Sequence, residues 1–305
     1  MIKYVFVSAA LKAFSCSRGT RCLYRWLGNA VGAKGRMSQP IPDYYYERLR
    51  RNLSLCLKYK ILEAGSQVLE LGTGWVHWDA LTLGLFFDVK TVLFDVWDNR
   101  QLAAFMAYLG QLNRWLPVSG LGCGHIARAQ SLIAKVLRLN SFEEIYQVLG
   151  FRYVLDAAGC LKMLEPGAFS LVISGGVLEH IGREQVPGSV GDWVRVLKPG
   201  GYAIHGINIK DHLYLYDRSV SPKQYLAYSD SVWHRYLENE VQYINRLQRS
   251  EWLRIFSGAG LQVAEEVTSR ADVSALKISD RYRGLSESDL ECTTLHVVLQ
   301  KLPAA

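Results

Sequence analysis

Short apolar runs rich in β-branched residues alternate with longer helical stretches from residue 67 onward, and this alternation constrains the fold more than any other feature. Runs of this length, bounded by polar or glycine residues, are typical of buried strands. A helix between two successive strands lets them pair in parallel, with helices on both faces of the sheet. Five such strands are expected, at residues 67–71, 90–95, 151–155, 169–174 and 202–207.

The end of the chain follows a different order. Residues 251–260 predict a helix that ends in glycine, and strands are expected near 261–268 and 293–300. These last two strands predict an antiparallel hairpin. The expected fold class is therefore α/β: a doubly wound, mostly parallel seven-stranded sheet with a C-terminal antiparallel hairpin.

Two stretches are too long to be simple connections. Residues 96–150 join the second and third strands, where one crossover helix needs only about 20 to 25 residues, so a helical insertion is expected there. A second insertion, about 208–250, is rich in Tyr, Trp and Arg. We expect a basic helical N-terminal extension, residues 1–60, followed by a main domain, residues 61–305.

Basic residues are concentrated in the N-terminal extension. Residues 1–60 contain 12 Lys and Arg against two acids, whereas the net charge of the whole chain is +7, so the remainder is slightly acidic. Interleaved aromatic and leucine side chains would suit contact with an anionic membrane surface through residues 1–36, or with an acidic partner. The alternative is a solvated helical arm whose aromatic side chains pack on the main domain.

Composition also bounds the compartment. No apolar stretch approaches the roughly 18 residues that a membrane-spanning helix requires. Lys12 interrupts the N-terminal apolar run, which argues against a secretion signal. The six cysteines are scattered without metal-ligand spacing and are interpreted as reduced thiols. We therefore expect a cytoplasmic protein, either free or peripheral to a membrane.

A glycine-rich turn follows the first expected strand, where open α/β sheets bind their ligands. The segment Glu70-Leu71-Gly72-Thr73-Gly74 allows a tight turn, and the free N–H groups of the next helix would face a ligand. A dinucleotide fingerprint would require glycine at position 77, which is His77. A turn that serves only the geometry of the chain is the other interpretation.

The next two strands each end in an aspartate. Asp95 could accept hydrogen bonds from both hydroxyls of a ribose, since a carboxylate matches a vicinal diol. The third strand ends at Asp156-Ala157. Either aspartate could instead cap a helix, but their order at successive strand ends favours a nucleotide-like ligand.

Two further segments complete the pattern. Ser174-Gly175-Gly176 leads into Leu178-Glu179-His180, and Leu197-Lys198-Pro199-Gly200-Gly201 precedes the fifth strand. Together with the glycine turn and the two aspartates, these segments resemble the class I S-adenosylmethionine (SAM)-dependent methyltransferases over roughly residues 60–210. The resemblance implies a Rossmann-like fold and SAM as the cofactor.

The resemblance also implies roles for individual residues. In these enzymes the glycine turn holds the amino-acid end of the cofactor, the acid after the second strand binds the ribose, and the acid-alanine step after the third strand binds the adenine. The expected cofactor-binding residues are accordingly Glu70, Gly72, Thr73, Gly74, Asp95, Asp156, Ala157 and Ser174.

Methyl transfer to a hydroxyl group needs a general base, because the sulfonium of SAM is already reactive. His180 is the first candidate, since imidazole titrates near neutral pH and the residue follows the fourth strand. In similar small-molecule O-methyltransferases a histidine here is the base. His205, Asp211 and His212 follow as a polar cluster, in which an aspartate could fix the tautomer of a histidine. Structural histidines and ordinary turn residues are the alternative interpretation.

Other methyltransferase classes are excluded by their chemistry. Amino-methylating DNA enzymes hold a flipped base with a Pro-Pro-aromatic loop that the Ser174-Gly175-Gly176 segment lacks, so no nucleic-acid partner is expected. Catechol-type enzymes carry a Mg²⁺-ligating aspartate at this strand end, and we therefore expect no metal ion.

The favoured function is O-methylation of a small-molecule substrate, a hydroxylated acceptor such as a sugar, a glycolipid precursor or a secondary metabolite. Three alternatives stay open. They are N- or C-methylation on the same fold, an NAD-dependent oxidoreductase, and a non-catalytic relative that binds SAM.

Overall fold

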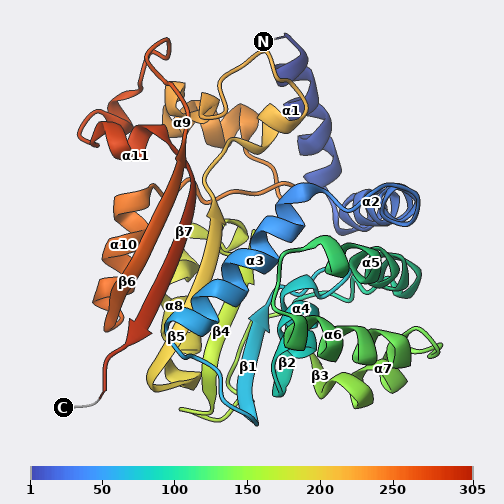
Figure 1. Cartoon of the computed structure of the whole chain (residues 1–305). Coiled ribbons are helices and arrows are strands. Elements are labelled where there is room, and N and C mark those ends of the chain that lie inside the picture. Colours follow the sequence, from blue (N-terminus) through green and yellow to red (C-terminus); the bar gives the residue numbers. More distant parts are fainter. Residues whose placement is uncertain (1, 304–305) are drawn as a thin grey trace. The chain divides into compact units, whose positions relative to one another are not determined.

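The computed structural model describes residues 2–303, and its strands form one sheet with the order β3-β2-β1-β4-β5-β7-β6 (Figure 1). Each strand expected from the sequence is present. The strand at 151–155 has the expected bounds, and the ends of the others are shifted by a few residues. The strands are β1 (Ser66–Leu71), β2 (Val89–Asp95), β3 (Phe151–Leu155), β4 (Phe169–Gly175), β5 (Leu197–Asn208), β6 (Leu261–Arg270) and β7 (Cys292–Lys301).

Helices of eight or more residues flank these strands. They are α1 (Ile2–Ser15), α2 (Arg18–Ser38), α3 (Asp43–Lys58), α4 (Trp78–Phe86), α5 (Leu102–Trp115), α6 (Cys123–Val136), α7 (Phe142–Leu149), α8 (Val186–Val196) and α10 (Arg249–Gly258). The first predicted insertion, residues 96–150, contains α5, α6 and α7, and the N-terminal extension is helical, as expected.

The second predicted insertion, residues 208–250, contains short helical turns in place of long helices. The short helical elements of the chain are η1 (Leu116–Val118), η2 (Leu178–His180), η3 (Arg183–Gln185), η4 (His212–Leu215), η5 (Gln224–Ala227), α9 (Asp230–Val232), η6 (Trp233–Leu237), η7 (Asp280–Tyr282) and α11 (Glu287–Glu291).

The chain divides into two compact units. The first unit contains the chain up to Asn29, then Gly176–Val190 and His205–Leu299. The second unit contains Ala30–Gly175, Gly191–Ile204 and the chain from Gln300 on. The predicted domain boundary near residue 60 stays a prediction. The two compact units are defined by contacts between residues, and they do not divide the chain at that position.

Four parallel strands organise the second unit. Ser66–Leu71 of β1 lies in register with Val89–Phe94 of β2, and β2 pairs with β3 in the same sense. On its other side β1 pairs with β4, also in parallel. The strand order therefore reverses between β1 and β4, which makes the sheet doubly wound and places the switch point at the carboxyl ends of these two strands.

The core of the second unit surrounds α4. Every residue of Trp78–Phe86 is buried, which explains why this helix is apolar on all sides instead of along one stripe. Trp78 is 1% exposed, and Phe105 of α5 and Ile133 of α6 are fully buried in the same cluster. The helices of the first insertion thus belong to this core.

The core of the first unit is built from aromatic side chains. Tyr225, Trp233 and Tyr282 are buried in one cluster, and Tyr4 of α1 packs into it. The Tyr4 hydroxyl donates to Asp211 Oδ2 at 2.7 Å. One aromatic side chain of the N-terminal arm therefore packs within the first unit, as one of the two sequence interpretations expects.

The Pro-Gly-Gly turn lies inside the bounds of β5, although the sequence pattern predicts it before the strand. Gly200 has φ +74, and a Cβ atom at Gly201 would lie 2.9 Å from the carbonyl oxygen of Lys198. Glycine is suited to the positive φ at position 200 and to the close approach of backbone at position 201. The chain therefore turns tightly here and continues directly as a strand. Farther along, β7 runs opposite to the end of β5 and lies beside β6, which completes the predicted C-terminal hairpin (Figure 1).

Two predictions on composition can be compared with the structure. All six cysteines are free thiols. Among residues 2–303, no helix combines the length and the apolar character needed to cross a bilayer.

Lys223 is a fully buried lysine in the first unit. Its Nζ donates to Gln248 Oε1 at 2.7 Å and to the carbonyl oxygen of Cys292 at 2.8 Å. Burial lowers the pKa of Lys223 to about 7, because a charged ammonium loses its hydration there. The two hydrogen bonds hold the amine in place in either protonation state.

The variant Lys223→Met should change how stability depends on pH. Between about pH 7 and pH 10 the unfolded chain keeps the lysine proton, whereas the folded protein has lost it. The free energy of unfolding of the wild type should therefore rise with pH, by up to about 1.4 kcal/mol per pH unit from this group. Denaturant titrations across this range should show the rise reduced in the variant. Identical pH profiles would contradict the assignment.

Candidate active site

The glycine turn after β1 has the left-handed backbone that its sequence predicts. Gly72 has φ +65 and Gly74 has φ +61, which L-residues rarely adopt. The amide of Gly72 donates to the carbonyl oxygen of Phe94 at 2.8 Å, so the turn is anchored to β2. The helix α4 then begins at Trp78.

The carboxylate of Asp95 joins this turn to the end of β2. Its Oδ2 accepts from the amide of Gly74 at 3.1 Å, and its Oδ1 accepts from the amides of Val96 at 2.8 Å and Trp97 at 3.4 Å. Burial raises the pKa of Asp95, and these three N–H donors oppose that effect. Asp95, which is predicted to bind the ribose, and the glycine turn, which is predicted to hold the amino-acid end of the cofactor, are therefore in direct contact.

Glu70 is a buried acid of β1 that accepts a hydrogen bond from the first turn of α4. It is 3% exposed, and its Oε2 accepts from the amide of Ala80 at 3.3 Å. Burial and the neighbouring Asp79 raise the pKa of Glu70, while Arg48, whose Nε lies 3.0 Å from Asp79 Oδ1, opposes the shift. Glu70 thus fixes the first turn of the helix that the glycine turn precedes.

Arg48 is a component that the sequence reasoning missed. It belongs to α3, which lies within the predicted extension, yet it contacts the end of β4 in the same unit. A Cβ atom at Gly175 would lie 2.6 Å from Arg48 Nη1, so glycine is required for the guanidinium to lie there. Nothing in the local pattern around position 48 indicates this contact, because it arises from packing.

His77 also has a role that the sequence left open. It is fully buried with φ +46, its Nδ1 lies 2.9 Å from Thr73 Oγ1, and its Nε2 lies 2.9 Å from the Tyr146 hydroxyl. Burial lowers the pKa of His77 to about 4, so the ring is neutral at pH 7. A histidine where a dinucleotide fingerprint has glycine therefore braces the turn through Thr73.

The end of β3 lies beside the end of β2. The amide of Asp156 donates to the carbonyl oxygen of Asp95 at 3.1 Å, and Asp156 Oδ1 accepts from the amide of Ala158 at 2.8 Å. Asp156 is half-buried and Ala157 is exposed, so both can be reached by a ligand. Ser174 is buried within β4.

The helix-cap alternative for the two aspartates does not fit the structure. The helix after Asp95 is α5, whose N-cap is Gln101. The stretch between Asp156 and β4 is described throughout and contains no helix. Their positions at adjacent strand ends thus have no capping role to explain them.

Two of the four candidate catalytic residues meet a third side chain, Glu179, in the first unit. Glu179 and His180 lie on η2 and His212 begins η4, and one ligand-type atom of each lies within 4.8 Å of the other two. The rings of His180 and His212 have centroids 5.0 Å apart. The sequence named both histidines, whereas it used Glu179 only as part of the family motif.

Hydrogen bonds orient His180 and Glu179. Nδ1 of His180 lies 2.8 Å from the carbonyl oxygen of Tyr243, so this nitrogen carries the proton and Nε2 keeps a lone pair. Desolvation lowers the pKa of His180 despite the exposed edge of the residue. Glu179 is 3% exposed, its Oε1 accepts from the amide of Asn208 at 3.3 Å, and burial raises its pKa to about 8.

The other two candidates lie outside this group. Asp211 accepts from the Leu213 amide at 2.9 Å and from the Tyr4 hydroxyl at 2.7 Å, so among the described residues its carboxylate contacts no histidine. The predicted Asp–His pair is therefore absent from residues 2–303. His205 is 1% exposed and stacks on Phe256 with centroids 6.2 Å apart, and burial lowers its pKa to about 3.

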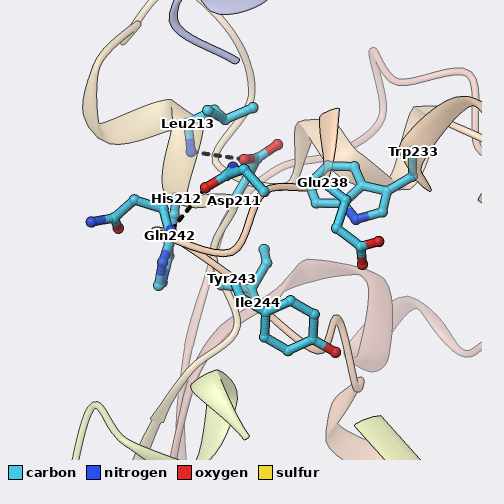
Figure 2. Close-up of a pocket in the computed structure, with 9 residues that line it drawn as sticks. Asp211, His212, Leu213, Trp233, Glu238, Gln242, Tyr243 and Ile244 are labelled. Carbon is cyan, nitrogen blue, oxygen red and sulfur yellow. Dashed lines mark hydrogen bonds between the residues drawn. The ribbon is translucent and has the colours of Figure 1, made fainter. Parts of the chain in front are cut away.

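A small cavity lies beside His212 within the first unit. Figure 2 shows His212, Trp233, Glu238 and Tyr243 around it, and Asp211 accepting the hydrogen bond from Leu213 away from the imidazole. The lining combines aromatic rings, a carboxylate and amide groups, and the cavity of about 10 Å³ has room for about one water molecule.

Comparison with known proteins finds a family model that matches part of this chain. Residues 120–205 match the family model described as a methyltransferase domain. The matched segment contains β3, β4 and the Glu179-His180 step, but not the glycine turn. The match covers less than a third of the chain, so the similarity to methyltransferase domains is shown for this segment.

Solved structures similar to the chain include a SAM-dependent methyltransferase from Methanosarcina mazei. It is 12% identical, with 81% of this chain and 98% of that chain covered and a TM-score of 0.44. Another is phosphoethanolamine N-methyltransferase 2 from Haemonchus contortus, 15% identical, with 86% of this chain and 56% of that chain covered and a TM-score of 0.47. At these identities and scores we base no argument on either. No curated protein matches the chain.

The variant Asp95→Asn should bind SAM more weakly. An amide at this position turns an –NH₂ donor, or a neutral oxygen, toward backbone N–H groups and cannot accept from both ribose hydroxyls. We expect the affinity for SAM to fall about 10- to 100-fold, as for the loss of hydrogen bonds to a charged group. Isothermal titration calorimetry measures this directly. The matched control is Asp98→Asn, since Asp98 is partly exposed and pairs with Arg100. Equal losses in both variants would contradict the assignment.

Proposed function

We propose that this methyltransferase transfers the methyl group of SAM to a hydroxyl oxygen of a small molecule, such as a sugar, a glycolipid precursor or a secondary metabolite. The observation that carries the proposal is the orientation of His180. Its Nδ1 is held by the Tyr243 carbonyl, which leaves the basic lone pair on Nε2, and the residue is a member of the Glu179–His180–His212 cluster. A hydroxyl acceptor needs such a base, whereas a neutral amine can attack before it loses its proton.

The reaction then requires little further chemistry from the protein. The acceptor oxygen attacks the methyl carbon in line with the carbon–sulfur bond, and the electron pair of that bond returns to sulfur. His180 Nε2 takes the proton of the hydroxyl. The products are the methyl ether and S-adenosylhomocysteine, and the imidazolium returns its proton to water.

The surroundings of the base support a polar acceptor. Burial and the adjacent His180 lower the pKa of His212 to about 3, so that ring stays neutral and does not repel the imidazolium that forms. Glu238 and Gln242 add polar groups near His212, and the ring of Trp233 offers an apolar face.

The variant His180→Ala should keep its affinity for SAM and lose turnover by roughly 100-fold or more, which is the range of general-base catalysis. Turnover is measured as labelled methyl groups incorporated into extracts of the source organism, and mass spectrometry of the product identifies the acceptor atom. His125→Ala is the matched control, because that histidine only packs its ring edge-on against Phe86. A variant with wild-type turnover would transfer the role to His212, and methylation of nitrogen or carbon would contradict the proposal.

The N-terminal arm supports a second proposal, contact with an anionic membrane. Ile2, Val5 and Phe6 of α1 are 84%, 54% and 76% exposed, and their i, i+3, i+4 spacing places them on one face of the helix. Trp26 of α2 is also 65% exposed. Residues 2–38 contain no acid and several basic residues, a combination that favours a negatively charged lipid surface.

Vesicle sedimentation tests this contact. The protein should bind vesicles of phosphatidylcholine with phosphatidylserine, bind pure phosphatidylcholine less, and be released at high salt because the attraction is electrostatic. Phe6→Ser should weaken binding, while Val263→Ser, a partly exposed apolar residue on β6, should not. Absence of binding to acidic vesicles would leave the solvated-arm interpretation.

A further inference from the structure

The Glu179–His180–His212 cluster has the composition of a metal site. It brings one carboxylate and two imidazoles from two separate segments, η2 and η4, to a common point within 4.8 Å. All three residues belong to the first unit, so the geometry lies within one compact body.

Two atoms of the cluster lack the hydrogen bonds that buried polar atoms normally have. Glu179 Oε2 and His212 Nδ1 are buried, and neither has a partner among residues 2–303. The residues themselves are 3% and 6% exposed. The His212 ring has one long polar contact, 3.4 Å between its Nε2 and the side-chain Nδ2 of Asn208. Leaving such groups unpaired in the protein interior is unfavourable, so the cluster is suited to a bound species.

We propose that Glu179, His180 and His212 bind a divalent transition-metal ion such as Mn²⁺, Fe²⁺ or Zn²⁺. Two neutral nitrogen donors with one carboxylate suit these ions, and three protein ligands leave positions open for further oxygen atoms. Mg²⁺ and Ca²⁺ prefer sets of oxygen ligands, so they fit this cluster less well.

Neighbouring groups already orient the donors as ligands require. The Tyr243 carbonyl accepts from His180 Nδ1, an arrangement that directs the opposite nitrogen of a ligating histidine toward its metal. The backbone amide of Asn208 donates to Glu179 Oε1 and orients that carboxylate in a similar way. Bonds of about 2.0–2.2 Å require the donor atoms to approach to roughly 3–4 Å of one another, which small side-chain rotations provide.

The ion would also serve the reaction, a role that rests on the proposed function. An acceptor hydroxyl bound to the ion loses its proton to water more readily. Its oxygen then forms the bond to the methyl carbon, the carbon–sulfur electron pair returns to sulfur, and the ether leaves the ion. With an ion present His180 is a ligand; without one, its Nε2 lone pair accepts the proton directly.

This proposal revises the sequence expectation of a metal-free protein. That expectation rested on Ser174-Gly175-Gly176 replacing the aspartate of catechol-type enzymes at the end of β4. The cluster uses other residues, and His212 is separated from Glu179 by 33 positions in the sequence. The ligand spacing therefore gives no recognisable short motif.

The test is a titration of the full chain, freed of metal by a chelator, with MnCl₂ in the absence of SAM and acceptor. We expect one Mn²⁺ per chain with a Kd in the micromolar range or below, and much weaker binding of MgCl₂. Pulsed electron paramagnetic resonance of the Mn²⁺-loaded wild type should show coupling to imidazole nitrogen, a readout that requires no variant. Mn²⁺ is preferred to Zn²⁺ as the probe because exposed Cys16, Cys22 and Cys123 could bind zinc.

Variants locate the site. His212→Ala and Glu179→Gln should weaken Mn²⁺ binding by at least about 100-fold, more than the loss of an outer hydrogen-bond partner typically does. His234→Ala is the matched control, since His234 also lies beside a carboxylate of the first unit, Glu238 at 2.6 Å, and should bind Mn²⁺ like the wild type. Circular dichroism confirms that each variant is folded.

The outcomes separate the two proposals. A wild type that binds neither Mn²⁺ nor Zn²⁺ at one ion per chain, or binds Mn²⁺ without nitrogen coupling and unchanged in His212→Ala, overturns the metal site. Methyl transfer that falls at least about tenfold after chelation and returns with Mn²⁺ supports the role of the ion, and unchanged turnover overturns that role. If the O-methylation proposal is wrong, the product will carry the methyl group on nitrogen or carbon, whatever the Mn²⁺ titration shows.

Discussion

The carboxylate of Asp95 is the constraint on which the predicted cofactor site depends. It accepts hydrogen bonds from the amides of Gly74, Val96 and Trp97, and the carbonyl oxygen of the same residue accepts from the amide of Asp156. One residue thereby ties together the ends of β1, β2 and β3. Because parallel strands end at the same edge of a sheet, a single acid can hold three segments that are far apart in the sequence.

Several polar side chains of the second unit stabilise this edge of the sheet. Glu70 fixes the start of α4, His77 braces the turn through Thr73, and Arg48 pairs with the acid beside Glu70. None of these contacts is strong by itself, since each exchanges a hydrogen bond to water for one within the protein. Their combined effect is to preorganise the backbone N–H groups and carboxylates of the predicted cofactor site.

The cluster in the first unit differs in that its polar groups are incompletely used. Glu179 and His212 each keep a buried atom without a partner among residues 2–303, and His180 keeps a lone pair that its hydrogen bond to Tyr243 leaves available. A protein interior tolerates such groups at functional sites, where a substrate or an ion satisfies them. Proton removal and metal binding draw on the same lone pairs, which is why one cluster supports both proposals.

The sequence by itself determined the order of strands and helices, the glycine turn, and the acids at the ends of β2 and β3. These are local features: β-branched runs, positive-φ glycines and residues at fixed offsets from a strand end follow from short-range chemistry. The tertiary structure decided which polar side chains meet. Arg48 reaches Gly175, Tyr146 reaches His77, and His212 reaches Glu179 while Asp211 turns instead to Tyr4. Contacts between residues distant in sequence depend on packing and on where each chain segment returns, and no local pattern records that.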